Sequence, residues 1–208
     1  AEMHKHSTAI GSFYEYYNWL PGDLPFAARF WGVDCAGAKF GVNICDGDGN
    51  EVIKDNTEGY RAWRHLQLAK MSNFTPENFT LKYRAVIGRN VPPSNFEYAS
   101  FQFLGDSMMN DTYAPLTAAG KNFLRFAGQR RRGNLMYPVL KPKDAFYIDK
   151  KIDDGRADHG TVFADNGRLG SGKQTAVRCV VGRYPNVRYE MLSDEAACYM
   201  QFGIKAYL

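Results

Sequence analysis

A short acidic stretch is the clearest candidate for site chemistry in this sequence. Oxygen-bearing side chains alternate with glycine over residues 46–50, which read DGDGN. Such spacing lets a tight turn direct several hard oxygen ligands at one cation, and we therefore predict a calcium site. The predicted ligands are Asp46, Asp48, Asn50, the carbonyl oxygen of Val52, and Glu58. An acidic surface turn without a metal is the alternative interpretation.

Glu58 is the least regular member of this predicted ligand set. It falls one residue later than the closing carboxylate of a usual calcium loop. It also stands three residues after Asp55, which is the spacing of a helix capping box. Glu58 could therefore serve only as a helix cap.

The sequence contains no residue pattern that points to catalysis. Residues 167–173, GRLGSGK, have the glycine and lysine spacing of a phosphate-binding loop, but Gln174 stands where a magnesium-binding hydroxyl is required. The alternation over residues 175–181 also favours a strand where such a loop needs a helix N-terminus. The four histidines form no metalloprotease spacing and accompany no nucleophile motif. We therefore predict a non-enzymatic protein, with a flexible hairpin at 167–173 and a packed, hydrogen-bonded His65.

The four cysteines fall into two pairs that are close in sequence, and neither pair has a metal-binding or redox C-x-x-C spacing. Disulfides formed in an oxidising compartment fit this arrangement best. Four cysteines allow three connectivities, and free buried thiols in a cytosolic protein are the alternative. We predict a disulfide between Cys179 and Cys198, which ties the last strand to its neighbour, and a companion disulfide between Cys35 and Cys45.

The composition is that of a packed globular protein. The chain has 208 residues, of which 45% are hydrophobic and 14% aromatic, so intrinsic disorder is excluded. The sequence has no apolar run of the length, about 18 residues, that a transmembrane helix requires. The net charge of +4, partly concentrated in Arg130–Arg132, would suit a nucleic acid or an anionic lipid. We favour an exposed basic loop and do not predict a nucleic-acid partner.

Helical periodicity dominates the first third of the chain. An apolar stripe over residues 1–20 predicts an N-terminal helix that stops at Pro21 and Gly22. The stripe consists of Met3, Ile10, Phe13, Tyr17 and Leu20, with polar His6 in the remaining position. Further helices are predicted at 24–31, 57–71 and 142–153.

Two of these helices have a predicted buried face. In the helix at 57–71 the buried side chains are Ala62, Trp63, Leu66 and Ala69. In the helix at 142–153 they are Ala145, Ile148 and Ile152, and Gly155 can end the helix. The glycine-rich loop 32–56, which holds the first cysteine pair, is too long for a simple connection. We expect such a loop to be functional or stapled.

Strand patterns follow the helices. Aromatic and alternating apolar side chains predict strands at 79–83, 96–104, 177–181 and 198–204. Cys179 and Cys198 fall on the apolar side of their strands, so both are expected to be buried. Because the sequence shows no repeat and no interdomain linker, we predict one α+β domain, with helices first and antiparallel strands after.

Three blocks of the sequence carry a resemblance to known proteins. The first block consists of Phe13, Tyr17, Pro21-Gly22-Asp23, Ala27 and Trp31-Gly32. The second consists of Glu58, Arg61-Ala62-Trp63 and His65-Leu66-Gln67-Leu68-Ala69. The third consists of Ala145, Ile148-Asp149, Lys151-Ile152-Asp153-Asp154-Gly155 and Gly160. In order and spacing these blocks resemble type IV pilin-like proteins, the large bacterial group that carries a prepilin-type N-terminal cleavage and methylation segment.

The resemblance implies a pilin-like α+β fold. In such a fold a long N-terminal helix packs on an antiparallel β-sheet, with a Gly/Asp-rich loop and a second helix between them. Residues 1–208 would form a single periplasmic domain. Its parts would be the C-terminal half of the long helix at 1–20, the loop and second helix at 21–77, and the sheet region at 78–208.

The function implied by the resemblance is structural. The chain would be a pilin or pseudopilin of a type IV pilus or type II secretion-like filament, and it would assemble with itself and with other pilin-like subunits. Members of the group begin with a leader and an apolar helix that anchors the subunit in the inner membrane, and we expect the printed chain to have been trimmed of that segment. The subunit would face the periplasm before assembly and lie in a periplasmic or extracellular filament afterwards. A secreted carbohydrate-binding module of largely β character, which uses its tyrosines and tryptophans, is the alternative.

Overall fold

The computed structural model describes residues 1–36, 45–54, 57–77, 84–105, 122–169, 173 and 175–204. The helices are α1 (Glu2–Tyr17), α2 (Ala27–Trp31), α3 (Val33–Ala36), α4 (Glu58–Leu68) and α5 (Pro142–Ile152). The strands are β1 (Ala99–Gly105), β2 (Asn122–Gly128), β3 (Val162–Asn166), β4 (Val180–Val181), β5 (Arg188–Tyr189) and β6 (Cys198–Gly203). All strand pairs are antiparallel, so the described part of the chain has the predicted α+β architecture.

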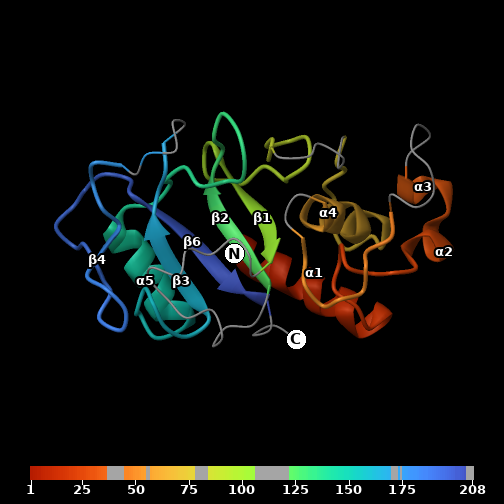
Figure 1. Cartoon of the computed structure of the whole chain (residues 1–208), viewed down its shortest axis with the longest axis horizontal. Coiled ribbons are helices and arrows are strands. Elements are labelled where there is room, and N and C mark those ends of the chain that lie inside the picture. The colour runs from red at the N-terminus through yellow and green to blue at the C-terminus, as the bar shows by residue number, and fades with distance from the viewer. Residues whose placement is uncertain are drawn as a thin grey trace.

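The larger sheet has four strands in the order β1-β2-β6-β3, and β4 pairs with β5 in a separate two-stranded sheet. Figure 1 shows the four-stranded sheet between two groups of helices, with α4 on the β1 side and α5 on the β3 side. α4 contacts β1, whereas α5 contacts β3, β5 and β6. The last strand of the chain, β6, lies inside the sheet between β2 and β3. The C-terminal part of the chain therefore completes the core.

The first helix ends earlier than the sequence predicts. α1 stops at Tyr17, and Asn18 adopts the left-handed conformation with φ 58°. The backbone N–H of Asn18 donates to the carbonyl oxygen of Tyr14 at 2.7 Å, which closes the last turn. Asparagine tolerates this conformation better than most residues do, so the helix ends before Pro21 is reached.

The predicted apolar stripe of α1 is confirmed at its centre, because Ile10 and Phe13 are fully buried. α1 packs against α4, and its His6 ring reaches the sheet at Phe101, with ring centroids 4.7 Å apart. The Glu2 carboxylate accepts hydrogen bonds from the Ser94 hydroxyl and the Asn95 backbone, which fixes the start of the helix. No helix in the described part of the chain combines the length and apolar character needed to cross a membrane.

One face of the four-stranded sheet is apolar and forms the main core. Because side chains alternate along a strand, every second residue of each strand points to this face. Its members are Phe101, Phe103, Leu124, Phe126, Val162, Ala164, Met200 and Phe202. Trp63 of α4 is also fully buried and packs edge-on against Phe103, with ring centroids 4.8 Å apart. This contact joins α4 to β1.

The opposite face of the sheet carries a buried polar row. Gln102, Arg125 and Gln201 are neighbours across β1, β2 and β6, and all three are buried. The Arg125 guanidinium donates to the Gln201 side-chain oxygen from Nε at 3.1 Å and from Nη2 at 2.8 Å. It also donates to the carbonyl of Leu135, whose N–H donates to Gln102 at 2.8 Å. The row therefore holds the segment around Leu135 over the sheet.

The buried face of α5 differs from the prediction. Ala145 is buried as expected, but Ile152 is 43% exposed and Asp149 is fully buried. Ile152 is the last residue of the helix and lies where the chain turns away, so it does not reach the core. The Asp149 carboxylate accepts hydrogen bonds from the Tyr189 hydroxyl at 2.7 Å and from the Gly155 backbone at 3.2 Å. Those bonds allow a carboxylate to occupy the buried position.

The remaining element predictions are confirmed in part. The helix predicted at 57–71 is α4, with Ala62, Trp63 and Leu66 buried, and the segment at 198–204 contains β6. The predicted strand at 96–104 begins later, as β1, and the one at 177–181 shortens to β4. The sequence patterns do not predict α3, β2, β3 and β5. Residues 79–83, the capping partner Asp55 and residues 170–172 of the glycine-rich hairpin lie outside the described residues.

Candidate functional site

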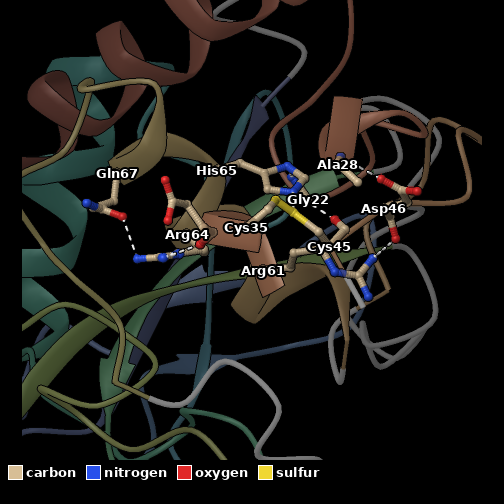
Figure 2. The surroundings of a disulfide bond; sticks show 10 residues. Gly22, Ala28, Cys35, Cys45, Asp46, Arg61, Arg64, His65 and Gln67 are labelled. Atoms are coloured by element: carbon tan, nitrogen blue, oxygen red, sulfur yellow. Dashed lines mark hydrogen bonds between the residues drawn. A yellow bond between two sulfur atoms is a disulfide. The ribbon is translucent and has the colours of Figure 1, made fainter. Parts of the chain in front are cut away.

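His65 lies at the centre of the region where α4 meets the turn after α1. The side chain is fully buried, as the sequence predicts for a packed histidine. Its Nδ1 accepts a hydrogen bond from the backbone N–H of Gly22 at 2.9 Å, and its Nε2 lies 2.9 Å from the carbonyl oxygen of Cys45 (Figure 2). Since a backbone N–H can only donate and a carbonyl can only accept, the proton of the neutral imidazole lies on Nε2. His65 thus joins the turn, the first disulfide and α4.

Burial lowers the pKa of His65 from 6.5 to about 3, and the nearby Arg61 guanidinium acts in the same direction. The bond to the Cys45 carbonyl opposes this shift by favouring the protonated ring. The imidazole is therefore neutral near pH 7, as its role as a hydrogen-bond acceptor requires. A base held with both nitrogens bonded to the backbone serves structure and not proton transfer.

An aromatic cluster surrounds the imidazole. The Phe13 ring is stacked on the His65 ring at a centroid distance of 6.1 Å, and the Trp31 ring lies 5.4 Å from it. Tyr17 contacts both Phe13 and Trp31, at 4.5 and 5.3 Å. These four residues come from α1, α2 and α4, so the cluster joins three helices that are separate in the sequence.

The disulfide between Cys35 and Cys45 lies against His65, as Figure 2 shows. The two Cα atoms are 5.4 Å apart, and both side chains are fully buried. Arg61 of α4 donates to the backbone carbonyl of Asp46, and Arg64 donates to the carbonyl of Asp34. α4 therefore holds both ends of the segment that this predicted disulfide closes.

Three carboxylates converge beside this unit. Ligand-type oxygens of Asp23, Asp48 and Glu58 all lie within 4.8 Å of one another. Asp23 is fully buried, Glu58 nearly so, and the Asp48 side chain is 39% exposed. Burial, with a smaller contribution from the negative charge of Glu58, raises the pKa of Asp23 to about 6, although the hydrogen bonds described below act in the opposite direction. Asp23 belongs to the turn after α1, so the cluster joins that turn to the acidic stretch.

Backbone donors and one lysine already bind these carboxylates. Asp23 accepts the N–H groups of Asn50 and Glu51 at 3.1 and 2.9 Å. Glu58 accepts the N–H groups of Asp48 and Lys54 at 2.9 and 2.8 Å, and the Lys54 ammonium pairs with Asp48. Three carboxylates are the kind of ligand that a hard divalent cation prefers. The same carboxylates already accept hydrogen bonds from the backbone of the loop, which hold it in place without a metal.

The structure separates the predicted ligands into two groups. Asp48 and Glu58 belong to the carboxylate cluster, with Asp23 as a third member that the sequence analysis did not name. Asp46 instead accepts the Ala28 backbone N–H at 2.8 Å, and the Asn50 side chain accepts the Val52 N–H at 2.8 Å. Asp23 belongs to the Pro21-Gly22-Asp23 turn, which is far in sequence from residues 46–50. Its spacing from that stretch matches no ligand pattern, so its place in a turn is the only signal that the sequence contains.

The second predicted disulfide joins Cys179 to Cys198, with Cα atoms 4.7 Å apart and both residues fully buried. Cys198 begins β6, and Cys179 immediately precedes β4. Asn166 of β3 lies opposite Cys198 and accepts the backbone N–H of Cys179 at 2.6 Å. The bond therefore ties the small β4–β5 sheet to the central strand of the large one.

Comparison with known proteins provides no assignment. No protein-family model, no curated protein and no solved structure matches the chain.

Proposed function

We propose that the chain is a structural subunit, a pilin or pseudopilin, of a type IV pilus or type II secretion-like filament. No enzymatic role is part of this proposal. The observation that carries it is that the residues on which the sequence resemblance depends are held by specific contacts, with the first two blocks meeting at His65. Each of the three blocks is a set of residues that make specific contacts, so their spacing has a physical cause.

The first two blocks meet at His65. Phe13, Tyr17 and Trp31 of the first block form the aromatic cluster around the imidazole of the second. The Gly22 N–H of the first block donates to that imidazole. A Cβ atom at Gly22 would lie 2.3 Å from the carbonyl oxygen of Glu58, so the turn can approach α4 only because this residue is glycine.

Two carboxylates of the third block hold the chain that follows α5. Asp149 accepts the Gly155 N–H, and Asp153 accepts the Val162 N–H at 3.1 Å. Gly160 has a φ of 73°, which L side chains rarely adopt, and an added Cβ atom would also meet the Asp153 carboxylate, so glycine is favoured there. This block therefore fixes the path from α5 into β3.

In the proposed filament subunit, α1 is the soluble half of a longer helix whose apolar half anchors the protein in the inner membrane. The described head faces the periplasm before assembly and the outside of the filament afterwards. The partners are other copies of the chain and further pilin-like subunits. Cystine bonds at Cys35–Cys45 and Cys179–Cys198 are consistent with an oxidising compartment.

The carbohydrate-binding alternative has less support from the side chains. Such modules stack sugars on exposed aromatic rings. Tyr16, Tyr98 and Tyr147 are exposed, but Trp63 is fully buried, and Trp19 and Trp31 are half-buried against the core. Four helices also precede the first described strand of the sheets, which is not the order of a largely β module.

Calcium is a second part of the proposal. The cation would bind the carboxylates of Asp23, Asp48 and Glu58 and would replace the Lys54 ammonium as their counter-charge. The support is the approach of three carboxylate oxygens within 4.8 Å in a loop rich in glycine. The calcium proposal and the filament proposal are independent of each other.

The filament proposal is tested by following the natural gene product in its source cells with antibodies raised against this chain. We expect a membrane-bound precursor that the prepilin peptidase shortens, and accumulation of the longer form when that peptidase is deleted. Cleavage by the general signal peptidase and release as a free protein would contradict the proposal and favour a secreted binding module.

A further inference from the structure

A cleft beside α5, at the opposite edge of the four-stranded sheet from α4 and His65, has features of a ligand site. It has a volume of about 550 Å³, which is within the range of small-molecule sites. It lies between Phe146 of α5, the residues that follow α5, and the segment around β5. Its lining includes two arginines, Arg156 and Arg188, and the apolar surfaces of Phe146, Tyr189 and Met191, and it contains no aspartate or glutamate.

The apolar part of the cleft is held in place by bonds to neighbouring elements. The Tyr189 hydroxyl donates to buried Asp149 at 2.7 Å, and the Tyr189 ring packs edge-on against Phe146 at a centroid distance of 5.8 Å. Buried Asp158 accepts the Val187 N–H at 3.0 Å. The apolar lining is therefore built before any ligand arrives, so little of the binding free energy is lost to ordering it.

The two arginines have donors left for a ligand. The Arg156 side chain is 52% exposed, and its Nη2 donates to the Pro185 carbonyl at 3.1 Å and lies 4.0 Å from Asp158. A guanidinium has five N–H donors, so most of those of Arg156 remain available. Within the described residues, the exposed Arg188 side chain makes no hydrogen bond or ion pair. Lys150 adds a third positive charge 5.8 Å from the centre of the Phe146 ring.

We infer that this cleft binds an organic carboxylate with an apolar body. The carboxylate would accept hydrogen bonds from Arg156 and Arg188, because guanidinium groups match the geometry of a carboxylate. The apolar body would lie on Phe146, Tyr189 and Met191. A free aryl or alkyl acid and the C-terminal carboxylate of a peptide share this chemistry. The inference does not depend on the filament proposal.

The test uses isothermal titration of the whole chain with 4-phenylbutyrate and with its neutral amide. We expect saturable binding of the acid and at least fivefold weaker binding of the amide. Arg188→Gln should raise the dissociation constant of the acid about fivefold, which is the effect of losing one exposed charge pair. Arg183→Gln is the matched control, since Arg183 is exposed in the connection between β4 and β5 and does not line the cleft.

A second ligand pair distinguishes the two sources of the carboxylate. If N-acetyl-Ala-Ala-Phe as the free acid binds more tightly than 4-phenylbutyrate, and its C-terminal amide does not, the natural ligand is a protein C-terminus. The reverse order of affinities assigns the cleft to a small acid. Equal binding of acid and amide, or no effect of Arg188→Gln beyond that of Arg183→Gln, would overturn the inference.

Discussion

The backbone N–H of Gly22 donates a 2.9 Å hydrogen bond to Nδ1 of His65, which lies 43 residues later in the chain. Because this contact joins the turn after α1 to the second long helix, it couples the position of the N-terminal helix to the folded head. The same imidazole reaches Cys45, so one neutral side chain holds three segments together. The first two predictions follow from it.

The first prediction concerns acid stability. His65 has a pKa of about 3 in the folded protein and 6.5 in the unfolded chain, so the unfolded chain binds one more proton between these values. Its contribution to stability is present above pH 6.5 and is lost as the pH falls, with a slope that approaches 1.4 kcal/mol per pH unit. His65→Gln removes this titration. Denaturant titrations should therefore show that the free energy of unfolding falls less steeply between pH 6.5 and 4 in the variant than in the wild type.

Other titrating groups remain in both proteins and cancel in the comparison. His6, with its pKa lowered to about 4, adds a slope of the same sign. Asp23, with its pKa raised to about 6, adds a slope of the opposite sign between pH 3.8 and 6. Identical slopes for wild type and His65→Gln would show that the imidazole titrates normally and is not held neutral.

The second prediction concerns the close approach at Gly22. Gly22→Ala would place Cβ 2.3 Å from the Glu58 carbonyl oxygen at a φ of 93°, so both a clash and backbone strain result. We expect a loss of about 3 kcal/mol or more in the free energy of unfolding. Gly88→Ala is the matched control, because Gly88 has φ 79° but no atom within 4 Å of the added Cβ. Gly88→Ala should lower the free energy of unfolding by only about 1 kcal/mol. Equal losses for the two variants would argue against close packing of the Gly22 turn on α4.

Predictions from the sequence succeeded where the cause of a feature is local. The stripe centred on Ile10 and Phe13 follows from helical periodicity, and each cysteine pairs with one 10 or 19 residues away. The packing of His65 was also predictable, because it lies on the apolar side of a short helix. These features need no knowledge of how distant segments meet.

The long-range polar contacts could not be predicted in this way. Arg125 lies in a strand buried on both faces, and its acceptor Gln201 is 76 residues away. Asp23 binds Glu51 across 28 residues, and neither spacing belongs to a periodic pattern. A buried charge is tolerated only where the tertiary fold brings its partners, so a sequence pattern that marks apolar positions misses both residues.

The third prediction concerns the second disulfide. Replacing Cys179 and Cys198 by alanine opens a loop with a sequence separation of 19 residues. The chain-entropy model predicts a loss of about 3 kcal/mol in the free energy of unfolding, measured by denaturant titration. The Cys35→Ala/Cys45→Ala variant, with a separation of 10 residues, should lose slightly less. A loss below about 1 kcal/mol for the first variant would contradict a stabilising bond between β6 and the residue before β4.

The fourth prediction concerns calcium. At about 100 times its dissociation constant, calcium bound to the folded state alone would stabilise it by about 2.7 kcal/mol, or raise Tm by about 5–10 °C relative to chelator. Asp48→Asn should abolish the rise, because it removes one of the three clustered carboxylates. Glu51→Gln is the control, since Glu51 contributes its backbone N–H and not its side chain to the cluster. An unchanged Tm for wild type would leave the loop as an acidic turn closed by its own backbone.

The central claim, that the chain is a filament subunit, is tested most directly by mass spectrometry of filaments sheared or purified from the source cells. We predict that peptides from this chain copurify with the filaments and that deletion of the prepilin peptidase removes them from that fraction. The control is a periplasmic protein without a prepilin-type segment, which should be absent from the filaments in both strains. Recovery of the chain only as a free periplasmic or secreted protein, in both strains alike, would contradict the claim.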